Sequence, residues 1–373
     1  MLSSVAIAPD RPMNALEPAS LADAFCTYPP EGFTSLRIPI GAGDAPAFLA
    51  DFDILTSLED DHRWITDTLA RLRLGRITRL RTFISGTTVT EYSTYPAIDP
   101  DGCKLLVDRF LDAAHAAKVQ LMIIKDLPHN SPLLSKRENR IADGIARACA
   151  EDGRFMLMEG QALAFVPIDF STIDEYLARA SKARRRDLRR KLRSRQELNV
   201  ETVPTGAAFD DERLLRILYQ QYLNVFYQDK HHFDKLSHDS LRSILIDDAN
   251  DGVVFLYRLS NRLIGYNLCF KYEGKFVDKY VGFEYPLARE NNLFFVSWFH
   301  NLEYALAHRL SHYVAGYNSP EVKADLGAHF TTSRHAVYVR NPLLRKMFVP
   351  LSRLVANDAG WTGSTPETRR QGA

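Results

Sequence analysis

The sequence predicts a mixed α/β fold with two domains and room for a third, and three observations support this prediction. The chain has 373 residues, which is enough for two domains at about 100–200 residues each. Short apolar runs alternate with amphipathic stretches of helical period along its length, as is typical of layered α/β proteins. Hydrophobic residues make up 46% and charged residues 25%, which is the composition of a folded globular protein.

The net charge, the cysteine spacing and the hydropathy argue against several classes of protein. The net charge of +1 argues against a general polyanion-binding protein but permits a local basic patch. The four cysteines form no C-x-x-C pair, so we expect a reducing compartment, no disulfide framework and no metal site. The chain shows neither a signal-peptide pattern nor 18 consecutive apolar residues. We therefore expect a cytoplasmic protein without a transmembrane segment.

The first half predicts one domain behind a loose leader. Residues 1–32 carry five prolines without a sustained period, so we expect a poorly ordered N-terminal segment. Residues 33–168 should form the first domain, in which β-rich and helical runs alternate. Its expected strands are Thr34–Pro39, Thr78–Ser85, Val119–Lys125, Phe155–Glu159 and Ala162–Ile168. Its expected helices are Leu58–Leu72, Leu105–Ala117 and Arg137–Glu151.

The second half predicts another domain over residues 169–350, followed by a polar tail at 356–373. Thr172 and Glu175 have the spacing of a capping box, which predicts a helix from there to about Arg195. The further expected helices are Glu212–Tyr227, Ser237–Asp247, Asn292–Arg309 and Pro320–Leu326. The expected strands are Asn199–Pro204, Val253–Leu259, Leu263–Tyr272, Lys275–Phe283, His312–Gly316 and Phe330–Arg340.

A three-stranded meander, a helix and then a further strand resembles the layout of the GNAT acyltransferase fold. The runs DKYVGFEYPLARENNLFF, NLEYALAHRL, GYNSPEVKADLGAHF and TTSRHAV resemble the C-terminal half of FemAB-like N-acyltransferases. The basic run ARRRDLRRKLRSRQ resembles the entry to BioF2-like acetyltransferase domains. The resemblance is specific over residues 173–342 and weaker over 34–168. It implies tandem GNAT-like acyl-CoA N-acyltransferase domains, of which the first could be a degenerate copy.

The resemblance implies an N-acyltransferase that moves an acyl group from a thioester, either acyl-CoA or an acyl-carrier, to an amine by direct attack. No tightly bound cofactor and no metal is implied. The loop Tyr285–Asn292 has no glycine, whereas GNAT proteins that use acetyl-CoA close glycine amides on the pyrophosphate there. An alternative is therefore a FemAB-type aminoacyl-tRNA-dependent ligase that acts on a cell-wall precursor. A further alternative is a non-catalytic binding protein that retains the fold.

The hairpin around Glu273-Gly274 supplies one set of candidate site residues. If Tyr272 pairs with Lys275, one face becomes small and polar, suited to the floor of a cleft or merely solvated. That face would hold Asn267 opposite Tyr280, Cys269 opposite Asp278, and Gly265 opposite Gly282. We expect Asn267 and Asp278 to bind substrate, Tyr280 to transfer protons and the Gly282 amide to face the donor. Lys279 lies on the apolar face, where a lysine needs a partner or an exit, and it matches a basic residue of the family, which implies a catalytic role.

A second set follows the strand His312–Gly316, at whose carboxyl end ligands of α/β proteins bind. There we expect Tyr317, Asn318 and Glu321 to bind substrate and Lys323 to place a cation near the acyl carbonyl; alternatively, Glu321 and Lys323 are exposed in a short helix. Ser333 and His335 share one face of the last strand, where Ser333 would bind substrate. His335 could relay protons near neutral pH, although a packed or surface histidine is the other interpretation.

The segment Lys182–Arg195 holds nine basic residues and one acid, so its net charge is 9 − 1 = +8. Such a segment could attract tRNA, the phosphates of CoA, an acidic carrier protein or an anionic membrane, or could be a solvated helix face. Arg184 interrupts the apolar stripe of this helix, so it should either form an internal salt bridge or face a ligand. Arg289 and Asn292 are candidates for phosphate contact. We expect the thioester or ester of the donor between Lys275–Phe283 and His312–Gly316, because GNAT-like sheets splay there.

Overall fold

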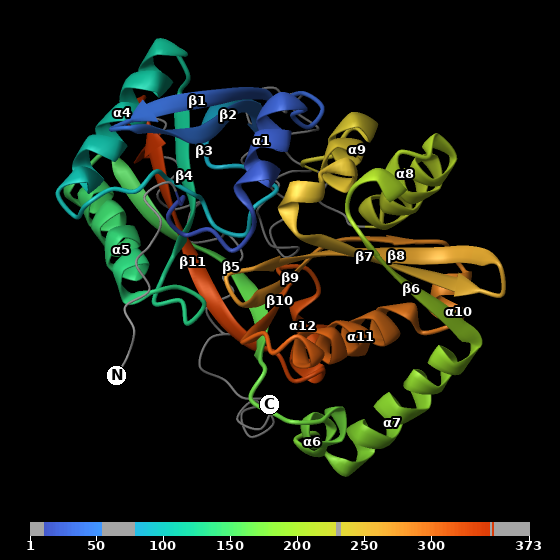
Figure 1. Cartoon of the computed structure of the whole chain (residues 1–373). Coiled ribbons are helices and arrows are strands. Elements are labelled where there is room, and N and C mark those ends of the chain that lie inside the picture. Colours follow the sequence, from blue (N-terminus) through green and yellow to red (C-terminus); the bar gives the residue numbers. More distant parts are fainter. Residues whose placement is uncertain (1–10, 54–78, 229–232, 344, 347–373) are drawn as a thin grey trace, which may run out of the picture. The chain divides into compact units, whose positions relative to one another are not determined.

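The computed structural model describes residues 11–53, 79–228, 233–343 and 345–346. Its helices and strands confirm the predicted mixed α/β fold (Figure 1). The chain forms two compact units. Unit 1 comprises the described residues of 1–15, 25–161 and 332–360, and unit 2 those of 16–24, 162–331 and 361–373.

Unit 1 is a mixed sheet with two helices packed against it. The strands β1 (Thr34–Ile40), β2 (Gly43–Asp53) and β3 (Arg79–Ser85) form an antiparallel meander. β3 is parallel to β4 (Leu121–Pro128), which pairs in turn with β11 (His329–Val339). The helices α4 (Gly102–Ala116) and α5 (Lys136–Glu151) pack side by side (Figure 1), and their apolar faces form the core with the sheet. A capping box between Ser135 and Glu138 begins α5.

The sheet of unit 2 repeats this pattern. The strands β6 (Leu198–Pro204), β7 (Gly252–Leu259), β8 (Arg262–Tyr272) and β9 (Lys275–Phe283) are antiparallel. β9 is parallel to β10 (His312–Gly316), which pairs with the second half of β5 (Phe155–Pro167). The helices α8 (Glu212–Phe226) and α9 (His238–Ile246) lie on one face, and α11 (Leu293–Ala307) covers the other (Figure 1).

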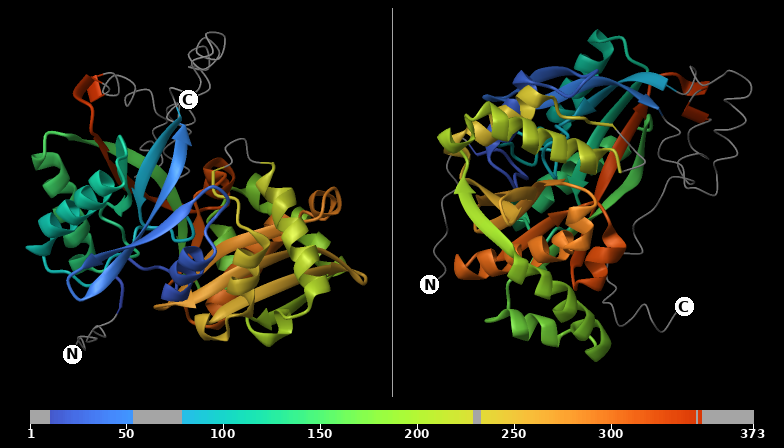
Figure 2. Two further views of the ribbon diagram at one scale, coloured as in Figure 1. Left: turned by 90° about the horizontal axis from the view of Figure 1, so that it is seen from above. Right: turned by 90° about the vertical axis from the view of Figure 1, so that its right-hand side faces the viewer.

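Shorter helices complete unit 2. α10 (Leu287–Glu290) precedes α11, and α12 (Pro320–Asp325) follows β10. The predicted helix from Thr172 to Arg195 is in fact α6 (Ile173–Ala178), α7 (Lys182–Leu192) and a 3₁₀ turn at Arg193–Glu197. The helix is interrupted because the Ser181 side chain accepts a hydrogen bond from the Arg184 backbone N–H and thereby caps the start of a new helix. In the right-hand view of Figure 2, α6 and α7 are the green helices at the lower end of unit 2, and both contact α11.

The two halves of the chain exchange their last strands. The sequence assigned Ala162–Ile168 to the first domain and the final strand to the second. Instead, β5 pairs with β10 from Ala164 onward, so this part belongs to unit 2. β11 pairs with β4 from Ser333 onward, so it belongs to unit 1. An apolar run predicts a strand but does not identify its neighbour, because strand pairing is decided by tertiary packing.

The N-terminal segment also differs from the expectation. Residues 11–32 are ordered: Met13 pairs with Tyr95, and α1 spans Ala19–Thr27. Met13 and Leu16 are buried, so apolar side chains hold this proline-rich stretch in place although it lacks a period. The sequence also missed β2 and α10. The expected helix Leu58–Leu72 and the tail at 356–373 lie outside the described residues.

Within the described ranges, no helix combines the length and apolar character needed to cross a bilayer.

Candidate functional site

The parallel strands β9 and β10 separate soon after they begin to pair. Their register joins Lys275 to His312 and Val277 to Val314, and the described residues of the two strands form no later pair. β9 nevertheless continues to Phe283, and β10 ends two residues beyond Val314. We call the point after Val277 and Val314 the unit 2 fork. This divergence lies where the sequence analysis expected the donor to bind.

A β-bulge lies directly beyond the fork. Tyr272 pairs with Lys275 and Cys269 with Asp278, as predicted, but Leu268 then pairs with Tyr280. Lys279 is therefore the extra residue of the bulge, a feature that is frequent next to active sites. The predicted pairs beyond this point are wrong: Asn267 lies opposite Val281 and Gly265 opposite Phe283. A two-residue alternation carried through the hairpin could not anticipate this one-residue shift.

Asp278 organises a buried polar network beside the fork. Its carboxylate accepts hydrogen bonds from Asn267 Nδ2 at 2.6 Å, Asn301 Nδ2 at 3.1 Å and the Tyr313 hydroxyl at 2.8 Å. Asn267 and Asn301 are fully buried and Asp278 is half-buried, so this part of the predicted polar face lies under α11. Burial, followed by the charge of Asp278, holds the pKa of the Tyr313 hydroxyl well above its usual value.

Lys279 has the partner that its apolar surroundings require. Its Nζ lies 3.5 Å from a carboxylate oxygen of Glu17, and both side chains are almost completely buried. Glu17 belongs to the stretch of unit 2 at residues 16–24, which the sequence analysis placed in the loose leader. This buried ion pair joins the N-terminal segment to the bulge.

Tyr280 and Gly282 continue β9 beyond the bulge. The Tyr280 ring meets the Tyr222 ring edge-on with centroids 6.1 Å apart. A Cβ on Gly282 would lie 2.2 Å from the Tyr266 ring, so the close approach of this ring explains the glycine. The sequence reasoning assigned Gly282 to donor contact and did not foresee this packing role.

Lys323 closes the end of β10. Its Nζ donates hydrogen bonds to the carbonyl oxygens of Ala315 at 2.6 Å and Gly316 at 3.1 Å. The side chain is buried, which rules out the alternative of an exposed lysine in a short helix. Of the other predicted residues on this segment, Glu321 and Asn318 are exposed, and Tyr317 is half-buried. Lys323 therefore holds the last two residues of β10 in place at the fork.

The residues expected to meet phosphate contact other side chains. Arg289 donates to Gln228 Oε1 at 2.9 Å and stacks on the Tyr285 ring. Asn292 Nδ2 donates to the Ser194 hydroxyl at 3.1 Å. Arg184 forms an ion pair with Asp325, which is the internal salt bridge that the sequence analysis left open.

The basic helix divides into two groups of side chains. Five of the nine basic residues have an acidic partner in the structure: Arg184, Arg189, Arg190, Lys191 and Arg195. Within the described residues, the other four form no ion pair: Lys182, Arg185, Arg186 and Arg193. The net charge of the segment Lys182–Arg195 is therefore partly neutralised by the fold, and these four cations remain available to a ligand.

Ser333 and His335 belong to unit 1, whereas the other candidate residues belong to unit 2. His335 Nδ1 accepts a hydrogen bond from the Asp126 backbone N–H at 3.0 Å. A neutral ring in this position carries its proton on Nε2, so it donates rather than accepts there. Burial lowers the pKa of His335, although the Asp126 charge opposes this shift. The geometry therefore does not suit a base that acts through Nδ1.

Sequence reasoning missed a buried polar segment in unit 1. Residues 87–95 follow Gly86, which has φ +83°, and most of their side chains are buried despite five Ser or Thr residues among them. Ser93 donates its N–H to Asp126 O at 3.3 Å and its hydroxyl to Ser85 O at 3.4 Å. The signal that could have found it is the glycine directly after a strand, followed by a dense run of hydroxyl residues.

Comparison with known structures shows the same fold at low sequence identity. L-PGS from Bacillus licheniformis superposes with a TM-score of 0.52 at 11% identity, covering 92% of this chain and 98% of that chain. The C-terminal domain of a putative lysylphosphatidylglycerol synthetase from Agrobacterium fabrum gives 0.52 at 13%, covering 87% and 90%. FemX gives 0.53 at 12%, covering 90% and 95%. A search of the curated proteins found no significant match.

The family comparison covers more than half of the sequence. Residues 94–349 match the FemAB-like family, which is described as peptidoglycan biosynthesis/recognition. The matched range contains the unit 2 fork, the basic helix and the strand of Ser333 and His335. Family and fold together support a transferase. The resemblance found in the local runs of sequence is thereby confirmed, and the chain belongs to the FemAB-like family.

Proposed function

We propose that the protein is an N-acyltransferase that moves an acyl group from an activated ester or thioester to an amine, with the donor carbonyl at the unit 2 fork. The observation that carries this proposal is the loss of β9–β10 pairing after Val277 and Val314. Backbone N–H groups that face a departing neighbour have no partner in that strand, and they are suitable donors to the oxyanion of acyl transfer.

The proposed chemistry needs few side chains. The amine attacks the donor carbonyl, the tetrahedral oxyanion is stabilised by β9 amides, and the bond to the ester oxygen or thioester sulfur then breaks. Tyr280 on β9 is our candidate for the proton transfer: its hydroxyl gives its proton to the departing oxygen or sulfur and takes up the amine proton in return. Lys323 acts here as a positioning residue, because its bonds to the Ala315 and Gly316 carbonyls hold the end of β10.

Two observations favour an aminoacyl ester on tRNA over acyl-CoA as the donor. The loop between β9 and α11 contains no glycine and instead forms α10, so it offers no glycine cradle for a pyrophosphate. The segment Lys182–Arg195 carries four cations without ion-pair partners in the described chain, which suits a long polyanion. The family description then makes a peptidoglycan precursor our candidate for the amine acceptor.

The donor is tested by binding at several salt concentrations. We expect deacylated tRNA to bind with a steep salt dependence and CoA to bind weakly. The variant Arg185→Gln/Arg186→Gln/Arg193→Gln should weaken tRNA binding and reduce the log–log slope by about one unit for each phosphate that the protein no longer binds. The matched control Arg189→Gln/Arg190→Gln changes cations that Asp174 and Asp187 already neutralise, so it should bind nearly as tightly as wild type. Equal losses in both variants would exclude a specific role for the unpaired group.

The transfer itself is tested by following label from the donor. Charged tRNA and acetyl-CoA, each labelled in the acyl group, are incubated with the protein and a peptidoglycan precursor that bears a free amine. Label that moves from tRNA into an amide supports the proposal. Label that moves only from acetyl-CoA would show that the donor is a thioester and not an aminoacyl ester on tRNA. A donor that binds but is never consumed would favour the non-catalytic alternative.

A further inference from the structure

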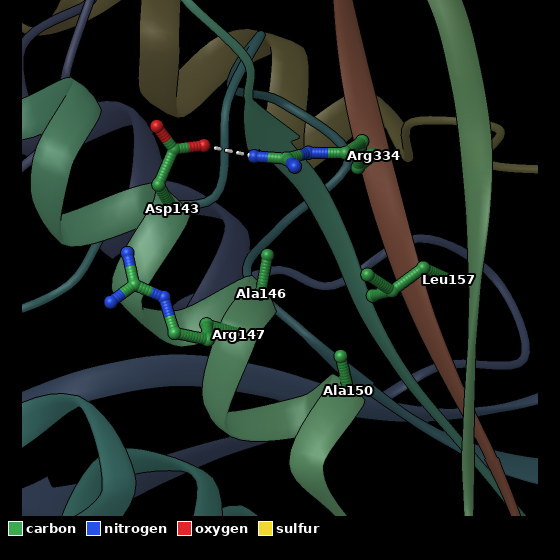
Figure 3. A pocket seen from close by; sticks show the side chains of 6 residues that line it. All are labelled: Asp143, Ala146, Arg147, Ala150, Leu157 and Arg334. Atoms are coloured by element: carbon green, nitrogen blue, oxygen red, sulfur yellow. Dashed lines mark hydrogen bonds and ion pairs between the residues drawn. The ribbon is translucent and has the colours of Figure 1, made fainter.

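A small pocket lies in unit 1, on residues that the proposed function does not use. Its volume is about 280 Å³, near the lower end of the about 300–1,000 Å³ typical of ligand sites. Figure 3 shows it between α5 and the strands β5 and β11. The lining residues are Asp143, Ala146, Arg147, Ala150, Leu157 and Arg334.

The charged groups leave the pocket with an excess of one positive charge. Arg334 reaches from β11 to form an ion pair with Asp143 on α5 (Figure 3). The same carboxylate lies 3.5 Å from His129 Nδ1, so its charge is already shared. Arg147, one helical turn after Asp143, forms no ion pair within the described residues. A ligand that balances this pocket is therefore a monoanion.

The Arg334 guanidinium could meet a ligand only at its outer edge. Its Nε is shielded from solvent and has no hydrogen-bond partner in the part of the chain that the structure describes, so a ligand in the pocket would contact the outer N–H groups instead. Arginine binds planar oxyanions through such N–H groups.

The remaining lining is apolar and small. Ala146 and Ala150 leave room along α5, and Leu157 is 42% exposed at the edge of the pocket. An aliphatic group of a few carbons would cover Leu157 and the alanine methyl groups. Inorganic phosphate lacks such a group, and as a dianion it would be repelled by Asp143.

We propose that this pocket binds a small carboxylate with a short aliphatic group, its oxygens between Arg147 and Arg334 and its carbon chain against Leu157. The site belongs to unit 1 alone and is independent of the donor fork in unit 2. It therefore adds a binding activity to the proposed transferase.

Isothermal titration of the full-length protein with isobutyrate and, separately, with inorganic phosphate tests the proposal. We expect one saturable isobutyrate site with a Kd of about 1 mM, given the few atoms of the ligand, and much weaker phosphate binding. Arg147→Gln should weaken isobutyrate binding by about tenfold or more, because the variant cannot form the charge-assisted hydrogen bond. Arg140→Gln is the matched control, since Arg140 is an exposed arginine two turns earlier on α5 that does not line the pocket.

A second variant tests the apolar half of the pocket. Ala150→Leu should fill the space beside Leu157 and abolish isobutyrate binding, while circular dichroism confirms that the exposed substitution leaves the fold intact. The proposal is overturned if isobutyrate shows no saturation at about ten times the expected Kd, or if Arg147→Gln binds as tightly as Arg140→Gln. Phosphate that binds more tightly than isobutyrate would also overturn it, because the aliphatic group would then contribute nothing.

Discussion

The two units share a strand pattern, yet they differ at the point where their parallel strands end. In unit 1, β3 pairs with β4 from Thr82 to Ser85 and then ends. The chain turns at Gly86, and Ser93 bonds both to Ser85 O and to Asp126 O. In unit 2, the pairing ends at Val277, but β9 continues through a bulge to Phe283. Unit 1 thus bridges the ends of its parallel strands with its own chain, whereas the strands of unit 2 diverge.

This difference shows why one copy of a repeated pattern suits ligand binding better. A bridging segment such as residues 87–95 satisfies the backbone groups at the strand ends, as buried backbone groups require. At the unit 2 fork, Lys323 bonds to the carbonyls at the end of β10, and Glu17 of the N-terminal segment pairs with Lys279 of the bulge. Under the proposed function, unit 2 is the donor-binding copy and unit 1 is the copy with a changed function.

The largest expected effect concerns the network beside the unit 2 fork. Asp278→Ala should lower the free energy of unfolding by about 4 kcal/mol, because three buried donors lose a charged acceptor. Urea denaturation measures the loss. Asp210→Ala is the control: Asp210 pairs with Arg242 on the surface, so its removal should cost less than about 1 kcal/mol. Equal effects would show that the fork does not depend on this network.

The next effect is a pH dependence in unit 2. Burial lowers the pKa of His300 to about 4, below the about 6.5 of an unfolded histidine. Between these values the unfolded state binds the proton and the folded state does not, so stability falls as the pH falls from about 6.5 to 4, by at most about 3 kcal/mol.

Urea denaturation across this pH range checks the prediction. His300→Gln should flatten the profile, and His308→Gln, which changes an exposed histidine at the end of α11, should not. An unchanged slope in His300→Gln would mean that another group is responsible.

Lys323→Met sharpens the contrast between the two copies. It removes the donor to two carbonyl oxygens, so we expect a loss of about 2 kcal/mol in the free energy of unfolding. If Lys323 positions β10 for catalysis, turnover should also fall at temperatures where the variant is fully folded. Lys104→Met, at an exposed position in unit 1, is the control for both measurements. A variant that is destabilised but fully active would leave Lys323 with a structural role alone.

The smallest effect is expected in the bridge of unit 1. Ser93→Ala removes the hydroxyl bond to Ser85 O while the backbone bond to Asp126 remains, so the loss should be about 1 kcal/mol. Turnover should not change, because this strand end is already closed by the chain. A large loss of activity without a loss of stability would reverse the assignment of roles to the two units.

The local sequence was sufficient to predict most of the elements. The helices α5, α8 and α11 and the hairpin of β8 and β9 follow from apolar periodicity and the Glu273-Gly274 turn. The predicted pairing of Cys269 with Asp278 is also confirmed. The pairs beyond it are wrong because a bulge depends on side-chain packing against neighbouring elements, which a single strand does not record.

The candidate site was anticipated only in part. A lysine at position 279 on an apolar strand requires a partner, and the sequence alone established that need. The structure identifies Glu17 as the partner, from a segment without any periodic signal. Likewise, Arg184 required an answering charge, and only the fold shows that Asp325 provides it.

By itself, the sequence determined the class of fold, the order of its elements and the short motifs around Lys323 and His335 that resemble the family. Periodicity, turn chemistry and residue spacing are local properties, which is why the sequence was sufficient for these. Only the tertiary structure decided that β5 and β11 exchange units, that His335 and Lys323 belong to different units, and that β9 and β10 diverge after three paired residues. These are choices of partner between segments far apart in the chain. They are set by the packing of whole elements against one another, and short stretches of sequence carry no record of that packing.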